Sequence, residues 1–187
     1  MYASRMSNLP PYLFARIDEM KADQVKKGVD IIDLGVGDPD LATPDHIVAA
    51  LCKAAKNPDN HHYPSYTGMP EYRKAVAGWY RNRFGVALDP GNEVLALMGS
   101  KDGIAHIAEA FVSPKDYVLA PSPGYPVYRT GTLFAEGRVH EMPLTQENGF
   151  VPVLGDIPKK VVKAAKLMFI NYPNNPTAAV APAGFYK

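Results

Sequence analysis

The sequence predicts an α/β fold, in which a mainly parallel sheet carries helices on both faces. From residue 93 onward, short apolar runs alternate with stretches whose apolar residues recur at helical spacing. This alternation is typical of βα units, because each helix returns the chain across the sheet and the next strand then runs parallel to the last. Hydrophobic residues make up 47% of the 187, enough to bury a core.

Helical patterns dominate the first 90 residues. Proline at the start of a helix and glycine just after its end are the signals that set the boundaries. We expect helices at 10–27 (ending at Gly28), from Pro44 with Thr43 as its cap, and from Pro70 to the stop at Gly85, and a short strand at 30–34.

From residue 93 onward, strands and helices are expected to alternate. Strands are expected where β-branched and other apolar residues cluster, and helices where glycine, proline or acidic caps precede an amphipathic run. The strands are predicted at 93–98, 117–120, 138–142 and 166–170, and the helices at 101–112, 125–136, after a cap near Asp156, and opening at 182–187. The strand at 166–170 is expected to leave an unpaired edge.

Composition excludes several classes of function. The net charge is +1 with both signs interspersed, which argues against nucleic-acid or membrane-surface partners. No apolar run approaches the roughly 18 residues of a membrane helix, so we expect a cytoplasmic protein. The single Cys52 excludes an internal disulfide and is expected to be packed, and His61 and His62 lack ligand spacing, so no metal site is predicted.

Two glycine-rich turns are candidate phosphate sites. Gly35-Val-Gly37 lacks the third glycine of a dinucleotide-binding motif and is followed by Asp-Pro-Asp, so it is read as a turn. Gly99-Ser-Lys-Asp-Gly103 lies where a strand would meet a helix, and there Ser100 and the Lys101 amide could hold an anion. An ordinary capped turn uses the same residue types and remains the alternative.

Two further positions carry polar or aromatic groups in rigid turns. Tyr125 lies between Pro123-Gly124 and Pro126, well placed to stack on a planar ring, with simple packing as the alternative. Asn175, in Asn171-Tyr-Pro-Asn-Asn-Pro-Thr177, supplies an amide donor, with a self-satisfied turn residue as the alternative. The asparagines of this turn are expected to point outward.

Together, in this order and spacing, the 99–103, 123–126 and 171–177 motifs resemble those of the class I/II aminotransferases, fold type I enzymes that use pyridoxal 5'-phosphate (PLP). Within that superfamily, the segment from Leu9 to Phe14 and the Asn-Asn-Pro-Thr sequence look most like the LL-diaminopimelate aminotransferase group. Ala178 departs from the pattern, because many relatives carry glycine after Asn-Pro-Thr.

The resemblance implies roles for individual residues. Tyr125 would stack on the PLP ring, Asn175 would donate to its phenolate oxygen, and Ser100 and the Lys101 amide would hold its phosphate. Tyr63, rather than Tyr66, would reach the phosphate of the other subunit in a homodimer.

The same resemblance implies contacts to the substrate. Tyr12, the backbone of Gly37, Lys101 and Asn175 would touch it.

The resemblance also implies an arrangement of domains. Residues 1–40 would be the N-terminal arm and connecting segment of a small domain, and 41–187 the N-terminal part of the PLP-binding large domain. The family's Schiff-base lysine, its pyridinium aspartate and its two arginines would lie in a missing C-terminal half. Lys187 lacks their sequence context, so no catalytic residue is assigned and the chain alone is expected to be inactive.

The function implied is the N-terminal portion of a PLP-dependent aminotransferase of amino-acid biosynthesis. It would act on an amino acid and a 2-oxo acid, with LL-diaminopimelate as the indicated substrate. A same-fold PLP lyase or synthase stays open, because the residues that set the reaction type are not in this chain. An inactive fragment or binding module is the third reading.

Overall fold

The computed structural model describes residues 2–9, 13–35, 37 and 39–187. They form two compact units. We call Met1–Pro10 with Leu97–Lys187 the sheet unit, and Pro11–Ala96 the helical unit. Each is described by itself.

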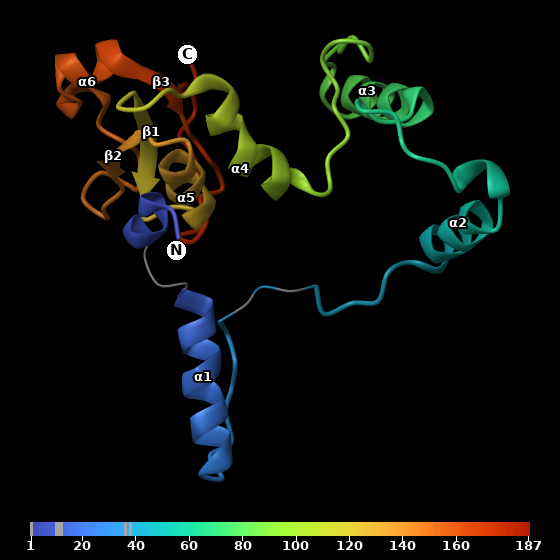
Figure 1. Ribbon diagram of the computed structural model, residues 1–187, viewed down its shortest axis with the longest axis horizontal. Helices are drawn as coiled ribbons and strands as arrows, with labels where there is room; N and C mark the ends of the chain where they lie inside the picture. The colour runs from blue at the N-terminus through green and yellow to red at the C-terminus, as the bar shows by residue number, and fades with distance from the viewer. Residues whose placement is uncertain (1, 10–12, 36, 38) are drawn as a thin grey trace. The chain divides into compact units, whose positions relative to one another are not determined.

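The sheet unit is built on three parallel strands in the order β2-β1-β3 (Figure 1). The strands are β1 (Tyr117–Ser122), β2 (Arg138–Pro143) and β3 (Ala165–Met168). β1 pairs with β2 without interruption, whereas its pairing with β3 shifts register between Tyr117 and Val118. The helices are α4 (Ser100–Phe111), α5 (Pro126–Phe134) and α6 (Lys159–Ala164), and the short 3₁₀ turns are η1 (Ser4–Asn8) and η3 (Leu154–Asp156).

Helices cover both faces of this sheet, as predicted. Neighbouring residues of a strand point to opposite faces. Val118, fully buried, packs with Ala108 of α4 and with Val112 just after it. On the other face Leu119 packs with Val161 of α6, completing the second layer.

The two helices of the first layer approach closely through small residues. A side-chain carbon at Gly131 of α5 would lie 2.6 Å from the backbone oxygen of Ala105 in α4. Next to it, Thr132 is fully buried, and its hydroxyl donates to the carbonyl of Tyr128 at 2.7 Å. Glycine at 131 is therefore required by space, since any side chain there would push the helices apart.

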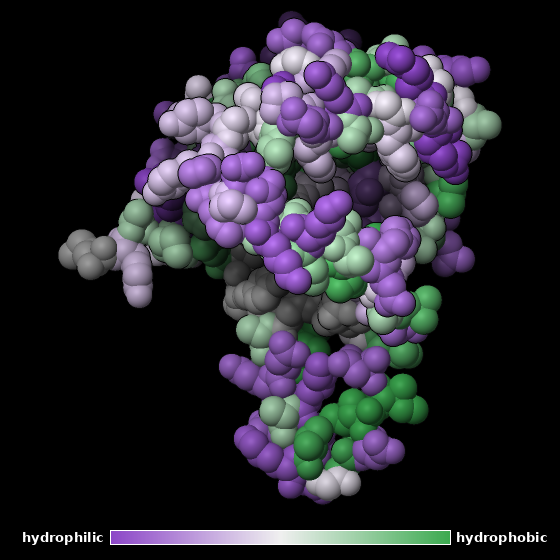
Figure 2. All heavy atoms as spheres, turned by 90° about the vertical axis from the view of Figure 1, so that its right-hand side faces the viewer, coloured by the Kyte–Doolittle hydropathy of each residue, from purple (hydrophilic) through white to green (hydrophobic). Residues whose placement is uncertain are grey.

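The helical unit contains α1 (Leu13–Lys26), α2 (Asp45–Ala55), η2 (Pro58–Asn60) and α3 (Pro70–Phe84). Gly85 ends α3 in the left-handed region at φ 69°, the predicted glycine stop. Ala77 is the one buried hydrophobic side chain in the described part of this unit. Figure 2 shows apolar residues at the surface among polar ones. The exposed apolar residues of α2 and α3 include Ile47, Val48, Leu51, Trp79 and Phe84.

Polar contacts rather than apolar burial join the segments of the helical unit. Arg73 of α3 donates to the carbonyls of Pro90 and Gly91 at 2.7 and 3.2 Å. Lys21 of α1 lies 2.6 Å from the carboxylate of Asp33. This contact lowers the pKa of Asp33, mainly through the Lys21 hydrogen bond, and raises that of Lys21.

Two predicted strands are wrong. Residues 30–34 and 93–98 are not strands, and within the described segments neither pairs with another strand. Both runs have the apolar composition of strands, but a strand needs a partner to receive its backbone hydrogen bonds. Apart from the helix expected to open at 182–187, the remaining strands and helices form within a few residues of their predicted bounds.

The structure also corrects several predictions about helix caps, helix bounds and the burial of Cys52. Pro44 itself is the N-cap of α2, without a side-chain hydrogen bond from Thr43. Asp156 lies in η3, and α6 begins only after Pro158. Residues 182–187 form turns rather than a helix, and Cys52 is exposed. β3 pairs with β1 alone, so its outer edge has no partner among the described residues, as predicted. None of the described helices is long and apolar enough to cross a membrane.

Candidate functional site

The N-terminus of α4 offers free hydrogen-bond donors. Gly99 precedes it at φ 82°, and no side chain caps the helix. The first backbone bond of the turn runs from Asp102 N to Gly99 O, at 3.2 Å. The N–H groups of Ser100 and Lys101 therefore have no partner inside the helix, and the side chains of both residues are exposed. Such a terminus attracts an anion.

The acidic side chain in this first turn is engaged elsewhere. A carboxylate oxygen of Asp102 lies 2.9 Å from Nδ1 of His106, one turn further along α4. His106 Nδ1 also lies 3.0 Å from the Asp102 carbonyl. The Asp102 carboxylate is thus directed along the helix toward His106.

Tyr125 lies beside this terminus. The Nζ atom of Lys101 is 5.8 Å from the centre of the Tyr125 ring, within the range of a cation–π contact. Tyr125 follows β1 and is the N-cap of α5. The turn before it is tight, since a side-chain carbon at Gly124 would overlap the backbone oxygen of Pro121. The structure therefore brings an ammonium group, free N–H donors and a half-buried aromatic ring together.

A row of aromatic rings leads from Tyr125 to the strand before the Asn-Pro turn. Tyr125 meets Tyr128 edge to face at 5.9 Å, and Tyr128 stacks on Phe169 at 4.5 Å with 17° between the planes. Burial, with a smaller contribution from Tyr125, raises the pKa of the Tyr128 hydroxyl. Because β1 and β3 are parallel, Tyr125 and the 171–177 turn both follow carboxyl ends of strands, at the same edge of the sheet.

The asparagine turn is organised by its own side chains. Asn171 Oδ1 accepts from the backbone N–H of Asn175 at 3.0 Å. Asn174 Oδ1 accepts from the N–H and hydroxyl of Thr177, at 3.3 and 2.9 Å. The Asn175 side chain is exposed and has no hydrogen-bond partner in the described part of the chain. Asn174, in contrast, is only 3% exposed, which corrects the expectation that all these amides point outward.

The sequence departure at Ala178 has a backbone explanation. Ala178 has φ 58°, in the left-handed region that favours glycine. Its N–H donates to the carbonyl of Asn174 at 2.7 Å, and the N–H of Asn174 donates to the carbonyl of Ala179 at 2.8 Å. The backbone therefore takes the conformation that a glycine would adopt without strain.

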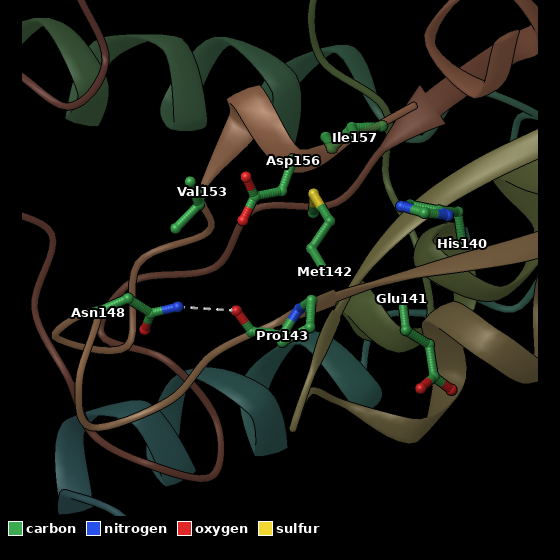
Figure 3. A pocket seen from close by; sticks show the side chains of 8 residues that line it. All are labelled: His140, Glu141, Met142, Pro143, Asn148, Val153, Asp156 and Ile157. Carbon is green, nitrogen blue, oxygen red and sulfur yellow. Dashed lines mark hydrogen bonds between the residues drawn. The ribbon is translucent and has the colours of Figure 1, made fainter. Parts of the chain in front are cut away.

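A separate cleft lies beside β2, the outer strand on the far side of β1 from β3. It has a volume of about 290 Å³ and is formed by β2 and the loop that follows (Figure 3). The amide of Asn148 donates to the carbonyl of Pro143 at 3.1 Å, and Asp156 and Met142 also line the cleft. Glu141 instead lies 2.7 Å from Arg129 in an ion pair. None of the predicted site residues that the structure describes lines this cleft.

The sequence pattern of the aminotransferase class I and II family matches residues 29–187. The chain belongs to this family. It is 59% identical over 184 residues to an LL-diaminopimelate aminotransferase of Desulforudis audaxviator, covering 98% of this chain and 47% of that protein. The corresponding enzyme of Aquifex aeolicus is 56% identical, with 100% and 48% covered. The chain thus spans about half the length of the curated relatives it matches.

Solved structures agree with this assignment. The structure of apo-BacF from Bacillus subtilis has a TM-score of 0.91 at 42% identity and covers 100% of this chain and 48% of its own. The parallel sheet with helices on both faces is that of the family, so the predicted fold class and the resemblance are confirmed.

The structure brings together part of the predicted aminotransferase site. Ser100, Lys101 and Tyr125 are neighbours, and Asn175 lies at the same edge of the sheet. The strand predicted before Ser100 is absent. Gly37 and Tyr63 belong to the helical unit, where both are exposed, and their roles stay predictions. Tyr12 lies outside the described residues.

Some residues that shape this candidate site had no role predicted from the sequence. Asn174 and Thr177 hold the turn around Asn175, and Phe169 and Tyr128 form the aromatic row beneath Tyr125. The three asparagines within five residues were a signal, but only the fold distinguishes the buried one from the exposed one.

Proposed function

We propose that this chain is the N-terminal portion of a PLP-dependent aminotransferase, with LL-diaminopimelate as amino donor and a 2-oxo acid as acceptor. The observation that carries the proposal is the cluster at the N-terminus of α4. The Lys101 ammonium lies 5.8 Å from the centre of the Tyr125 ring, and the same helix end carries uncapped N–H groups and the Ser100 hydroxyl. The LL-diaminopimelate aminotransferases that match at 54–59% identity support the choice of substrate.

The donors and the ring suit PLP, which combines a phosphate dianion with a flat aromatic ring. The N–H groups of Ser100 and Lys101 and the Ser100 hydroxyl would bind the phosphate at the positive end of the α4 dipole. Tyr125 would stack on the ring, and the exposed amide of Asn175 would donate to the phenolate oxygen. When bound, PLP supplies the electron sink that amino-group transfer requires.

The residues of this chain would bind and orient rather than transfer protons. Tyr125 would fix the plane of the ring, and a donor from Asn175 would stabilise negative charge on the phenolate oxygen. Lys101 adds a positive charge near the phosphate site, which also suits an anionic substrate. Tyr12 and Gly37 would complete the substrate side.

The remaining features concern assembly and compartment. We infer that the complete protein is a cytoplasmic homodimer in which Tyr63 reaches the phosphate site of the other subunit. Tyr63 is fully exposed in the helical unit, so its hydroxyl is free to do so. We also propose that these 187 residues by themselves bind the cofactor non-covalently and do not transfer amino groups.

Cofactor binding tests the site directly. Titration of the chain with PLP, followed by its absorbance, should give a dissociation constant that rises about tenfold or more in Ser100→Ala, since a hydrogen bond to a charged group contributes about 1.5–3 kcal/mol. Ser113→Ala, a matched change at an exposed serine of the same unit, should leave the constant unchanged. Equal effects of the two substitutions would reject the site.

The activity is tested on the complete protein. With LL-diaminopimelate and 2-oxoglutarate, the acceptor should be converted to glutamate, measured by chromatography. Release of ammonia or loss of carbon dioxide without glutamate would point to a lyase of the same fold instead. Turnover by the 187-residue chain alone would contradict the proposed division of labour.

A further inference from the structure

In the side-chain amide of Asn174, the oxygen accepts hydrogen bonds, whereas the nitrogen has no hydrogen-bond partner among the described residues. Its Oδ1 faces two donors of Thr177, the backbone N–H and the hydroxyl. A backbone N–H can only donate, so the amide atom that faces it must be the oxygen, and this fixes the orientation of the amide. The Nδ2 atom then points the other way, where it is buried without a partner among the described residues.

A small cavity adjoins this residue. It leaves about 10 Å³ for the centre of a water-sized molecule, at the lower end of what one water needs. Buried Met142 and Leu144 form an apolar part of its wall, and Asn171 and Tyr172 a polar part. Among the described residues no charged side chain lines it, so the chemistry favours a neutral guest over an ion.

We propose that this cavity binds a single internal water molecule, which accepts a hydrogen bond from Asn174 Nδ2. A water in such a site needs two to four polar partners. Pro121, at the end of β1, and Ile170 and Asn171, after β3, also line the cavity, and their backbone carbonyls would be the acceptors for the water. The water then links the asparagine turn to the two strands beneath it.

The consequence concerns the exposed neighbour, Asn175. Its backbone N–H is held by Asn171 Oδ1, and the turn around it is closed by Thr177 on Asn174. With the water in place, Asn174 is anchored on both sides, so Asn175 projects from a rigid base. This inference does not depend on the proposed cofactor, because it concerns the chain alone.

Counting long-lived waters by oxygen-17 magnetic relaxation dispersion tests it. Asn174→Leu removes the donor at similar volume and should lower the count by one relative to the natural chain. Thr177→Val removes the hydroxyl bond to Oδ1 but keeps Nδ2 and the cavity, so its count should not change. An unchanged count in Asn174→Leu, or an equal fall in both variants, would overturn the proposal.

A crystal structure of the natural chain gives an answer even if Asn174→Leu does not fold. Density for a water within hydrogen-bond distance of Nδ2 is expected. A dry cavity, or Nδ2 bonded directly to a protein group, would overturn the site.

Discussion

The sheet unit and the helical unit differ in how their apolar residues are used. In the sheet unit, alternate residues of one strand, Val118 and Leu119, are buried under helices on opposite faces. In the helical unit, Ala77 is the buried hydrophobic side chain of the described residues, while Leu51 remains 69% exposed. The first unit has a core of its own, and the second consists of helices whose apolar faces are largely uncovered.

The difference between the units follows from how helices and strands satisfy their backbone hydrogen bonds. A helix satisfies its backbone internally, so α2 and α3 form although their faces stay exposed. A strand depends on a neighbour for its hydrogen bonds, so β1 forms where β2 and β3 flank it, whereas 30–34 and 93–98 stay unpaired. The predictions below test whether the two units are energetically distinct.

The largest effect is expected from the core of the sheet unit. Leu119→Ala should lower the free energy of opening of the β1 amides by about 2–5 kcal/mol, measured by hydrogen exchange, because a buried leucine leaves a cavity. Leu51→Ala, at an exposed position, should change stability by no more than about 0.5 kcal/mol.

The same variants show whether the units unfold separately. The single tryptophan, Trp79, lies in the helical unit, so its fluorescence in urea reports on that unit. If Leu119→Ala moves the Trp79 transition as far as the β1 exchange, the two units unfold as one and the comparison fails.

Alanine substitutions at two glycines should change the free energy of unfolding in opposite directions. Gly131→Ala in α5 is expected to destabilise the sheet unit by about 1–3 kcal/mol, because the new carbon meets the Ala105 carbonyl. Gly78→Ala in α3 meets nothing within 4 Å and should stabilise its helix by about 0.5–1 kcal/mol. Thermal unfolding followed by circular dichroism measures both, and a stabilising Gly131→Ala would show that α4 and α5 are not in close contact.

At alkaline pH the sheet unit should weaken. Burial raises the pKa of Tyr128 above the ordinary 10.0, so the folded state resists ionisation that the unfolded chain accepts. The contribution is fully present below the unfolded pKa and is lost as pH rises through the folded one. Ultraviolet titration at the tyrosinate band should show the late transition in the natural chain, and Tyr128→Phe should remove it.

At acid pH a smaller effect is expected in the helical unit. The Gly91 N–H, followed by the Asn92 amide, lowers the pKa of Asp89 below 3.8. The resulting stabilisation is present above the unfolded pKa and disappears as pH falls through the lowered value. Carbon-13 NMR titration of the carboxyl should give a midpoint below that of Asp89 in the unfolded chain, and a midpoint at or above 3.8 would contradict the turn geometry.

Much of the fold and part of the site could be predicted from the sequence. The stop at Gly85 and the helix starting at Pro70 are local signals, readable without tertiary context. The strand at 93–98 was overpredicted because composition cannot show whether a partner is present. The turns that carry Ser100, Tyr125 and Asn175 make these residues candidates from the sequence, and their roles stay predictions. The inward orientation of Asn174 depends on packing beneath the turn, which no local pattern encodes.

Gly131 sets a spacing that matters beyond its own contact. It lets α5 approach α4 at the Ala105 carbonyl. One of these helices begins with the donors of Ser100, and the other begins directly after Tyr125. The absence of a side chain at 131 therefore helps to determine the distance between the Ser100 donors and the Tyr125 ring. A larger residue there would therefore change the distance between the Ser100 donors and the Tyr125 ring, although residue 131 belongs to neither group.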